Sequence, residues 1–139
     1  MSNDNKKPTV EEVIKILHMV YDPELNVSLG EAGLVKPEYI KIDEENKKIW
    51  VLWVPTTPLC PLIPQIGLAI KVTLERMFPG WKAEPRLHPD IPNAEVWNEQ
   101  MKDESMLKAI KEEMDARGWW PYFIRPRPDL GLEDVPYEM

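Results

Sequence analysis

Apolar residues recur with a helical period near the start of the chain. Thr9 precedes this segment, and Glu12 three residues later completes the residue pair of a capping box. The apolar positions at helical spacing are Val10, Val13, Ile14, Leu17 and Val20. Proline disfavours helical geometry in the residue before it, so Pro23 predicts that this helix ends at residues 21–22.

Two segments in the next part of the chain have the pattern of a β-hairpin. Residues 38–42 and 49–54 are separated by the polar residues 43–47. The second segment is continuously apolar, which predicts a central strand buried on both faces. Because side chains alternate along a strand, Trp50 and Trp53 are expected on its opposite faces.

Proline and glycine mark another strand and a loop. A third strand is predicted at residues 81–88, and Pro85 indicates an edge position because proline cannot donate a ladder hydrogen bond. Residues 25–33 have the composition of a loop, in which Gly30 and Gly33 are available for positive φ angles.

Two further helices are predicted. Residues 56–61 turn into the second helix, which ends at the Pro-Gly pair of residues 79–80. Its expected buried stripe is Leu62, Ile66, Ala69, Thr73 and Met77. Asp103 or Asn93 could cap the third helix, and Gly118 would end it. The expected apolar face of that helix is Met106, Leu107, Ile110 and Met114.

The order of elements predicts an α+β fold. Helix–strand–strand–helix–strand–helix forms a two-layer α/β sandwich over residues 9–118, preceded by a disordered leader at residues 1–8. Residues 119–139 are an aromatic and proline-rich arm without periodicity, which either packs on the domain or binds a partner. Trp119 and Trp120 would anchor such an interface, because adjacent indoles suit a binding surface.

Composition excludes several classes of function. The 139 residues carry a formal net charge of −7, which argues against nucleic-acid binding, because that depends on Lys and Arg neutralising phosphates. The longest apolar run, residues 49–54, is far too short to span a membrane. The first residues are polar and lack the apolar region of a secretory signal, so a cytoplasmic protein is expected.

Cys60 is the only cysteine and the most informative candidate. One thiol forms neither an intramolecular disulfide nor a closed zinc site, so a metal here would borrow ligands from carboxylates, histidines, a second copy or another protein. A position at the start of a helix predicts a thiol pKa lowered from about 8.5 toward about 7. Pro64 would weaken this effect by delaying the helix, and the alternative is a small buried apolar residue.

Other candidate groups are less specific. Asp22-Pro23-Glu24 could ligate a metal, act as acid and base, or cap turns. His18 and His88 have no metal-binding spacing, and nothing in the sequence pairs either of them with Cys60 as a catalytic base.

Three motifs occur in order: Asp22-Pro23-Glu24, Gly33-Leu34-Val35 and Thr56-x-Pro58-x-Cys60-Pro61. Together they resemble the PaaD-like and SufT-like family of iron–sulfur cluster assembly proteins, which includes the eukaryotic cytosolic targeting factors. Residues 95–103 are similar to the region after the last strand in eukaryotic-type members. Glu31-Ala32 replaces the usual Asp-Leu, and Pro55 and Leu59 are less usual in the cysteine motif. The additional C-terminal cysteines of PaaD proteins proper are missing, which disfavours a ring-oxygenase accessory role.

The resemblance implies a non-enzymatic role in delivering iron–sulfur clusters, with an iron–sulfur scaffold or client proteins as partners, and with a homodimer as a further expectation. Cys60 would be the functional thiolate and a transient metal ligand shared with a second chain. Asp22 and Glu24 would line its pocket, and Thr56 or Thr57 would donate a hydrogen bond to the thiolate. The alternatives to this transfer role are a metal-free adaptor with a structural Cys60 and a thiol-dependent enzyme.

Overall fold

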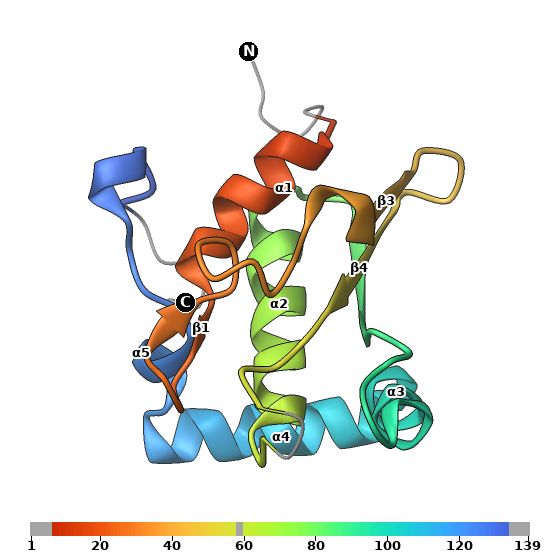
Figure 1. Cartoon of the computed structure of the whole chain (residues 1–139), viewed down its shortest axis with the longest axis vertical. Helices are drawn as coiled ribbons and strands as arrows, with labels where there is room; N and C mark the ends of the chain where they lie inside the picture. Colours follow the sequence, from red (N-terminus) through yellow and green to blue (C-terminus); the bar gives the residue numbers. More distant parts are fainter. Residues whose placement is uncertain (1–6, 58–59, 134–139) are drawn as a thin grey trace.

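A small sheet and one central helix organise the chain, as the computed structural model shows (Figure 1). The structure describes residues 7–57 and 60–133. Its elements are α1 (Val10–Ile16), β1 (Tyr21–Asp22), β2 (Val27–Ser28), β3 (Ile40–Asp43), β4 (Lys48–Trp53), α2 (Ile63–Met77), β5 (Lys82–Leu87), α3 (Ala94–Lys102), α4 (Glu104–Arg117) and α5 (Trp120–Phe123), with 3-10 turns at Leu17–Met19, Pro37–Tyr39 and Pro128–Leu130. The α+β class is therefore confirmed. No helix in the described part of the chain has the length and apolar character needed to cross a bilayer.

The sheet has the order β3-β4-β5, with β4 in the centre as predicted. β3 and β4 form the expected antiparallel hairpin, in which Ile40 lies opposite Val51. β5 runs parallel to β4, with Leu87 beside Trp53. A parallel neighbour requires a crossover connection, and α2 supplies it.

The outer edge of β5 is blocked by side chains. The backbone N–H of Ala83 donates to Glu75, and its carbonyl accepts from Lys71. The N–H and carbonyl of Leu87 are both bound by the Asn98 amide, at 2.7 and 3.3 Å. Pro85, between them, has no N–H. An exposed edge invites pairing with another chain, so β5 is closed to strand addition.

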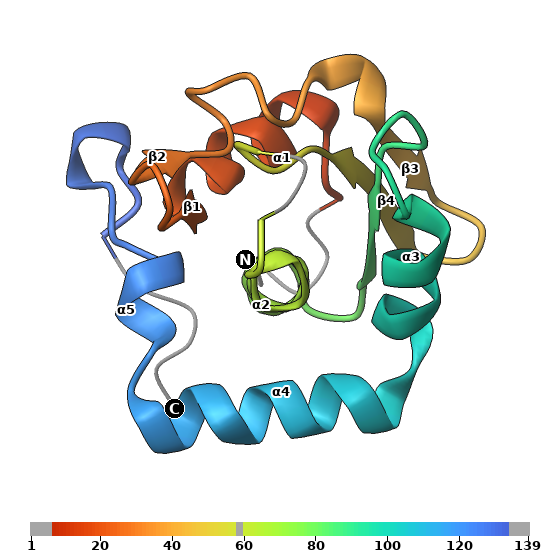
Figure 2. The same cartoon turned by 60° about the horizontal axis from the view of Figure 1, so that its bottom comes forward.

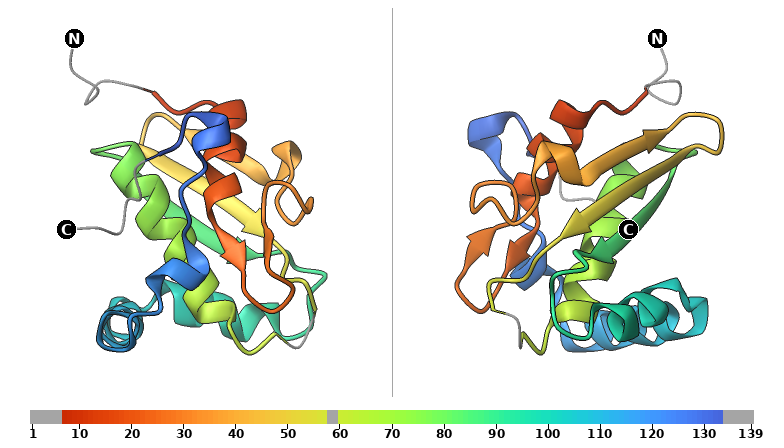
Figure 3. Two further views of the ribbon diagram at one scale, coloured as in Figure 1. Left: turned by 90° about the vertical axis from the view of Figure 1, so that its left-hand side faces the viewer. Right: turned by 45° about the vertical axis from the view of Figure 1, so that its right-hand side comes forward.

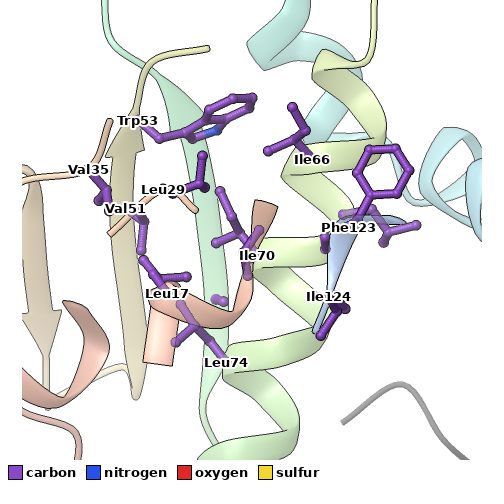
Figure 4. Close-up of a cluster of buried hydrophobic side chains, with 14 of the residues drawn as sticks. Leu17, Leu29, Val35, Val51, Trp53, Ile66, Ile70, Leu74, Phe123 and Ile124 are labelled. Atoms are coloured by element: carbon purple, nitrogen blue, oxygen red, sulfur yellow. The ribbon is translucent and has the colours of Figure 1, made fainter. Parts of the chain in front are cut away.

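β4 is buried on one face. Ile49, Val51 and Trp53 are buried, whereas Lys48, Trp50 and Leu52 are half-exposed. Trp50 and Trp53 lie on opposite faces as predicted, but burial on both faces was wrong. The reason is that α1 and α2 cover the Trp53 face only, where Trp53 packs toward Ile66 and Ile70 of α2 (Figure 4).

α2 is buried around most of its circumference. Its buried residues are Ile63, Ile66, Gly67, Leu68, Ala69, Ile70, Thr73 and Leu74. Three of the five predicted stripe positions are among them, while Leu62 and Met77 are half-buried. The predicted stripe covers less of the helix surface than is buried in the structure. The reason is that α4 and α5 pack on the side of α2 that a two-layer sandwich leaves to solvent (Figure 2).

The predicted third helix is in fact two helices. Asn93 precedes α3, and the Asp103 carboxylate caps α4 by accepting the N–H groups of Ser105 and Met106. Both candidate caps are therefore at helix starts, with the chain turning between them. Gly118 ends α4 with a φ of 65°, as expected. On the predicted apolar face, Ile110 and Met114 are buried, but Leu107 is half-buried and Met106 is exposed.

The first helix is shorter than predicted. Thr9 caps it by accepting the Glu12 N–H, but α1 ends at Ile16 and a 3-10 turn follows. The chain at residues 21–22 is already extended as β1, which pairs with β2 inside the predicted loop. Gly33 has the expected positive φ, of 71°. The φ angle of Gly30 is not positive. Glycine is needed there because a Cβ would collide with the His18 imidazole.

The described part of the arm packs on the domain. α5 lies against α2 and β1, and the next residues run beside the end of α1 (Figure 3, left). Ile124 forms a β-bridge with Val20, and the Arg125 N–H donates to the Met19 carbonyl at 2.9 Å. Of the predicted leader, Pro8 is buried. Residues 1–6 and 134–139 lie outside the described part, so the predictions for them are not tested.

We expect Asn98→Ala to destabilise the fold by about 1–3 kcal/mol, because it leaves the buried N–H and carbonyl of Leu87 without partners. Urea unfolding measures the change. Gln100→Ala, on the same helix, is the control and should change the unfolding free energy by less than about 0.5 kcal/mol. Equal unfolding midpoints for Asn98→Ala and the parent protein would contradict the closed-edge interpretation.

Candidate functional site

The Asp22 carboxylate joins two of the sequence motifs. Asp22 is 0% exposed at the end of β1. One oxygen accepts the Glu24 N–H at 3.1 Å, which forms an Asx turn around Pro23. The other accepts the Thr56 N–H, 34 residues later, at 2.9 Å. A buried carboxylate is costly unless it is hydrogen-bonded, so these two bonds fix the cysteine loop to the first motif.

The Gly33-Leu34-Val35 motif supports the same loop. The Leu34 carbonyl accepts the Val54 N–H at 2.9 Å, directly after β4. At the other end of the loop, the Cys60 N–H donates to the Thr57 carbonyl at 3.2 Å. Pro58 and Leu59 lie outside the described residues. All three motifs therefore converge on the segment that carries Cys60.

The Cys60 thiol is buried and neutral. Cys60 is 1% exposed, and burial is the main reason that its pKa rises from 9.0 to about 11. The charges of Asp22 and Glu24 raise the pKa further, whereas a hydrogen bond from the Leu62 N–H lowers it. The predicted lowering of the pKa was wrong, because α2 begins only at Ile63 and the thiol precedes its first turn.

Thr56 does not donate the hydrogen bond to the thiol that the resemblance implied, and the corresponding role of Thr57 stays a prediction. Thr56 Oγ1 is buried and has no hydrogen-bond partner within the described residues. Thr57 is half-buried, and its backbone carbonyl holds the Cys60 N–H. Leaving a buried hydroxyl without a hydrogen-bond partner costs about 1–3 kcal/mol of stability. The Thr56 hydroxyl, four residues before the cysteine, is therefore available to donate a hydrogen bond.

An apolar pocket of about 130 Å³ adjoins these motifs. It is lined by Pro23, Leu62, Trp119, Tyr122 and Phe123. Pro23 is the middle residue of the acidic motif, and Leu62 follows Cys60 by two residues, so the arm contributes aromatic residues beside both motifs. The sequence pointed to the aromatic arm but not to Leu62, Tyr122 or Phe123 in particular.

The two arm tryptophans have different environments. Trp119 is half-buried, lines the apolar pocket and lies under the Arg117 guanidinium, 5.2 Å from the ring centre. Trp120 is buried, and its indole N–H donates to Asp115 at 2.6 Å. Trp120 is therefore part of the core in this conformation. A partner-binding role for the pair stays a prediction, and the structure favours Trp119 and the exposed Tyr122 as its carriers.

Arg127 connects the arm to residues 18–31, and no sequence pattern indicated these contacts. Its guanidinium binds both oxygens of Glu31, at 2.7 and 3.0 Å, and also Asp129 and the His18 carbonyl. The hydrogen bonds that Glu31 accepts from Arg127 and from the Ser28 hydroxyl lower its pKa to about 2. Beside them, Arg125 lies 4.2 Å from the Tyr21 ring centre. The arm is thus held across the strand that ends in Asp22.

The histidines are engaged away from Cys60. His18 Nδ1 lies 2.8 Å from the Ile14 carbonyl, and His88 Nδ1 accepts the Asp90 N–H at 3.1 Å. Among residues 7–57 and 60–133, no three histidine, cysteine or acidic side chains gather as a set that could hold a metal ion. A metal ion at Cys60 would therefore need further ligands, from outside the described histidine, cysteine and acidic side chains.

We expect the Cys60 thiol to titrate with a pKa near 11 in the folded chain. Thiolate absorbance, measured against Cys60→Ser, tests this. Because the folded chain holds this proton more tightly, the contribution to stability is complete below pH 9 and is lost as the pH rises through about 11. Glu24→Gln should lower the pKa, and Glu112→Gln should not. A titration midpoint at or below 8.5 would refute the buried neutral thiol.

We expect Glu31→Gln to loosen the arm. The Arg125 N–H, which donates to Met19, should then exchange with solvent several-fold faster. In the parent protein the ionised Glu31 is held by Arg127, so protection should be complete above pH 4.5 and decline as the pH falls toward 2. Hydrogen exchange measured by NMR tests both points, with Glu38→Gln as the control. An unchanged protection factor in Glu31→Gln would refute a fastening role.

Known proteins are similar to this chain. A family model described as "Iron-sulfur cluster assembly protein" matches residues 10–84, more than half of the chain. Cytosolic iron-sulfur assembly component 2B of Mus musculus is 29% identical over 103 residues, which are 73% of this chain and 63% of the mouse protein. The protein of the same name in Dictyostelium discoideum is 30% identical over 101 residues, 71% of this chain and 62% of that protein.

A MIP18 family protein of Caenorhabditis elegans is 33% identical over 105 residues, which are 73% of this chain and 66% of that protein. The chain thus spans just under two thirds of the length of these relatives. The mouse and Dictyostelium proteins bear the name of an assembly component and not of an enzyme, in agreement with the expected non-enzymatic role. The match covers the acidic motif, the cysteine loop, β3, β4 and the first half of β5, and so this chain belongs to the iron–sulfur cluster assembly protein family.

Proposed function

We propose that this protein acts in cytosolic iron–sulfur cluster assembly and passes a cluster to client proteins, with Cys60 as a transient thiolate ligand. The observation that carries the proposal is the convergence of the acidic motif and the cysteine loop through Asp22. The names of the relatives support the cytosolic assembly role.

The number of ligands requires a second chain. Protein ligands hold an iron–sulfur cluster at four positions, and this chain has one cysteine. The remaining ligands would come from a client, a scaffold or a second copy of this protein. A cluster held in this way is shared and easily released, which suits transfer rather than storage.

The surrounding charges favour a metal-bound thiolate over a free one. Asp22 and Glu24 raise the pKa of the isolated thiol because a second and third negative charge repel the thiolate. The same carboxylates attract the cationic iron–sulfide core. Metal binding deprotonates a coordinating thiol outright, so the proton would leave Cys60 only when the cluster arrives. Without a cluster, a neutral buried thiol is protected from oxidation.

Transfer requires the cysteine loop to open, because Cys60 is 1% exposed. The apolar pocket beside Pro23 and Leu62 is where a client side chain could enter and displace the loop. In the opened loop, the unpartnered Thr56 hydroxyl would donate a hydrogen bond to the thiolate. These steps use only groups that flank the thiol.

One observation favours the adaptor role as a second candidate. A cysteine that is almost fully buried and has a pKa near 11 also fits a structural residue. In that case the protein would bring a scaffold and an apo-client together through its surface. Among the described residues, the hydrogen bonds of both histidines involve groups other than Cys60, so they do not favour a thiol-dependent enzyme.

We expect anaerobic reconstitution of the protein together with an apo-client to give the visible absorption of an iron–sulfur cluster on the mixture, and cluster delivery to the client. Cys60→Ser should slow delivery by about tenfold or more while leaving the unfolding midpoint within the range of a conservative core change. The readouts are visible absorption and client activity.

Glu24→Gln keeps the fold and the thiol but removes one charge, so its delivery rate should lie between those of the parent and Cys60→Ser. Equal client maturation by the parent and Cys60→Ser would rule out the ligand role and leave the adaptor. Retained client binding by Cys60→Ser would then identify the adaptor function directly.

A further inference from the structure

Five cationic side chains line one cavity in this acidic protein. The cavity has a volume of about 340 Å³, and its cations are Lys48, Lys71, Lys82, Arg86 and Lys102. They come from β4, α2, β5 and α3, so the fold and not a local run of sequence gathers them. The lining contains two carboxylates, Glu84 and Glu104. We call this feature the cationic pocket.

The interior of the cationic pocket is held rigidly. Lys48 and Arg86 share Glu84, at 3.4 and 3.3 Å, and each cation lies about 5.5 Å from the centre of the Trp50 ring. Lys71 binds Glu75 and the Ala83 carbonyl. One carboxylate for two cations leaves an excess of positive charge around Trp50.

The rim of the pocket is only weakly paired. Lys82 lies 3.9 Å from Glu104, and Lys102 lies 3.2 Å from Glu99. The side chains of both lysines are more than half exposed, and the two glutamates are 89% and 74% exposed. Exposed ion pairs of this kind contribute about 0–1 kcal/mol, so a carboxylate from a ligand can replace Glu104 or Glu99 at little cost.

The apolar lining sets a second requirement for the ligand. The half-buried Trp50 and Leu107 line the cavity together with the buried Met101. The backbone N–H groups of Ser105 and Met106, which start α4, already bind Asp103. These two N–H groups are therefore not available to bind a compact phosphate at the start of the helix. A lining that combines lysines with apolar residues matches carboxylates spaced along a chain that also carries apolar side chains.

We infer that the cationic pocket binds an acidic segment of a partner protein, with glutamate or aspartate side chains on Lys82 and Lys102 and an apolar side chain against Trp50 and Leu107. The closed edge of β5 means that side chains, and not strand addition, hold the segment. This inference goes beyond the proposed function and does not depend on Cys60.

The acidic surface elsewhere does not prevent this binding. The net charge of −7 repels an acidic partner at long range. At physiological salt, however, charges separated by more than about 8 Å are largely screened. The pocket therefore determines the local interaction, and the repulsion mainly slows the approach of the partner.

The test uses a dye-labelled synthetic peptide of alternating glutamate and leucine, with a glutamine–leucine peptide as the neutral match, and contains no iron. Fluorescence anisotropy gives the affinity, and NMR follows the Trp50 indole signal, assigned with Trp50→Phe. We expect the acidic peptide to bind and to shift that signal. Lys82→Gln with Lys102→Gln should weaken binding by about tenfold.

The matched control is Lys41→Gln with Lys108→Gln, which changes the net charge equally at exposed positions outside the pocket and should alter affinity by less than twofold. Equal loss in both double variants would overturn the inference, as would equal binding of the neutral peptide. Displacement of the peptide by low millimolar inorganic phosphate would also overturn it and identify a site for compact anions. Because no cluster is present, these outcomes are independent of the Cys60 proposal.

Discussion

The site depends on one buried carboxylate. Asp22 has no exposure to solvent, and its two oxygens bind the N–H groups of Glu24 and Thr56. Removing either bond would leave a charged or polar group buried without a partner, which is among the most costly defects in a protein interior. The acidic turn and the cysteine loop are therefore fixed to each other, and the first motif is a structural requirement of the site as well as a source of charge.

This arrangement separates protection from reactivity. Burial and two nearby negative charges keep the Cys60 thiol neutral, so the resting protein has little thiolate for an oxidant to attack. A cationic metal centre reverses the effect of the same charges. In the proposed transfer, the loop and the aromatic arm control access, whereas the carboxylates control the protonation state. The cationic pocket, lined by residues of β4, α2, β5 and α3, would add a partner contact distinct from the thiol.

The sequence patterns predicted correctly those features that depend on neighbouring residues. The Thr9 cap, the hairpin around β4, the edge position of β5 and the Gly118 stop follow from neighbouring residues, and the structure confirms them. The errors come from long-range packing. α4 and α5 widen the buried surface of α2, and α1 ends early because residues 21–22 pair with β2. In the site, the motifs predicted which segments meet. They did not predict that α2 begins only at Ile63, so that the Cys60 thiol lies before the helix. The Arg127 contacts had no sequence signal, because those with Glu31 and His18 join residues 96 and 109 positions apart.

The long separation of those contacts has a consequence for biosynthesis. Arg127 binds the His18 carbonyl 109 residues earlier, and Ile124 pairs with Val20. Chains emerge from the ribosome N-terminal end first, at about 5–20 residues per second. Cys60 therefore leaves the ribosome several seconds before the arm that packs beside its loop. During this interval the nascent chain presents uncovered apolar surface at Pro23 and Leu62, so this is the period in which unwanted association beside the cysteine loop would most readily occur.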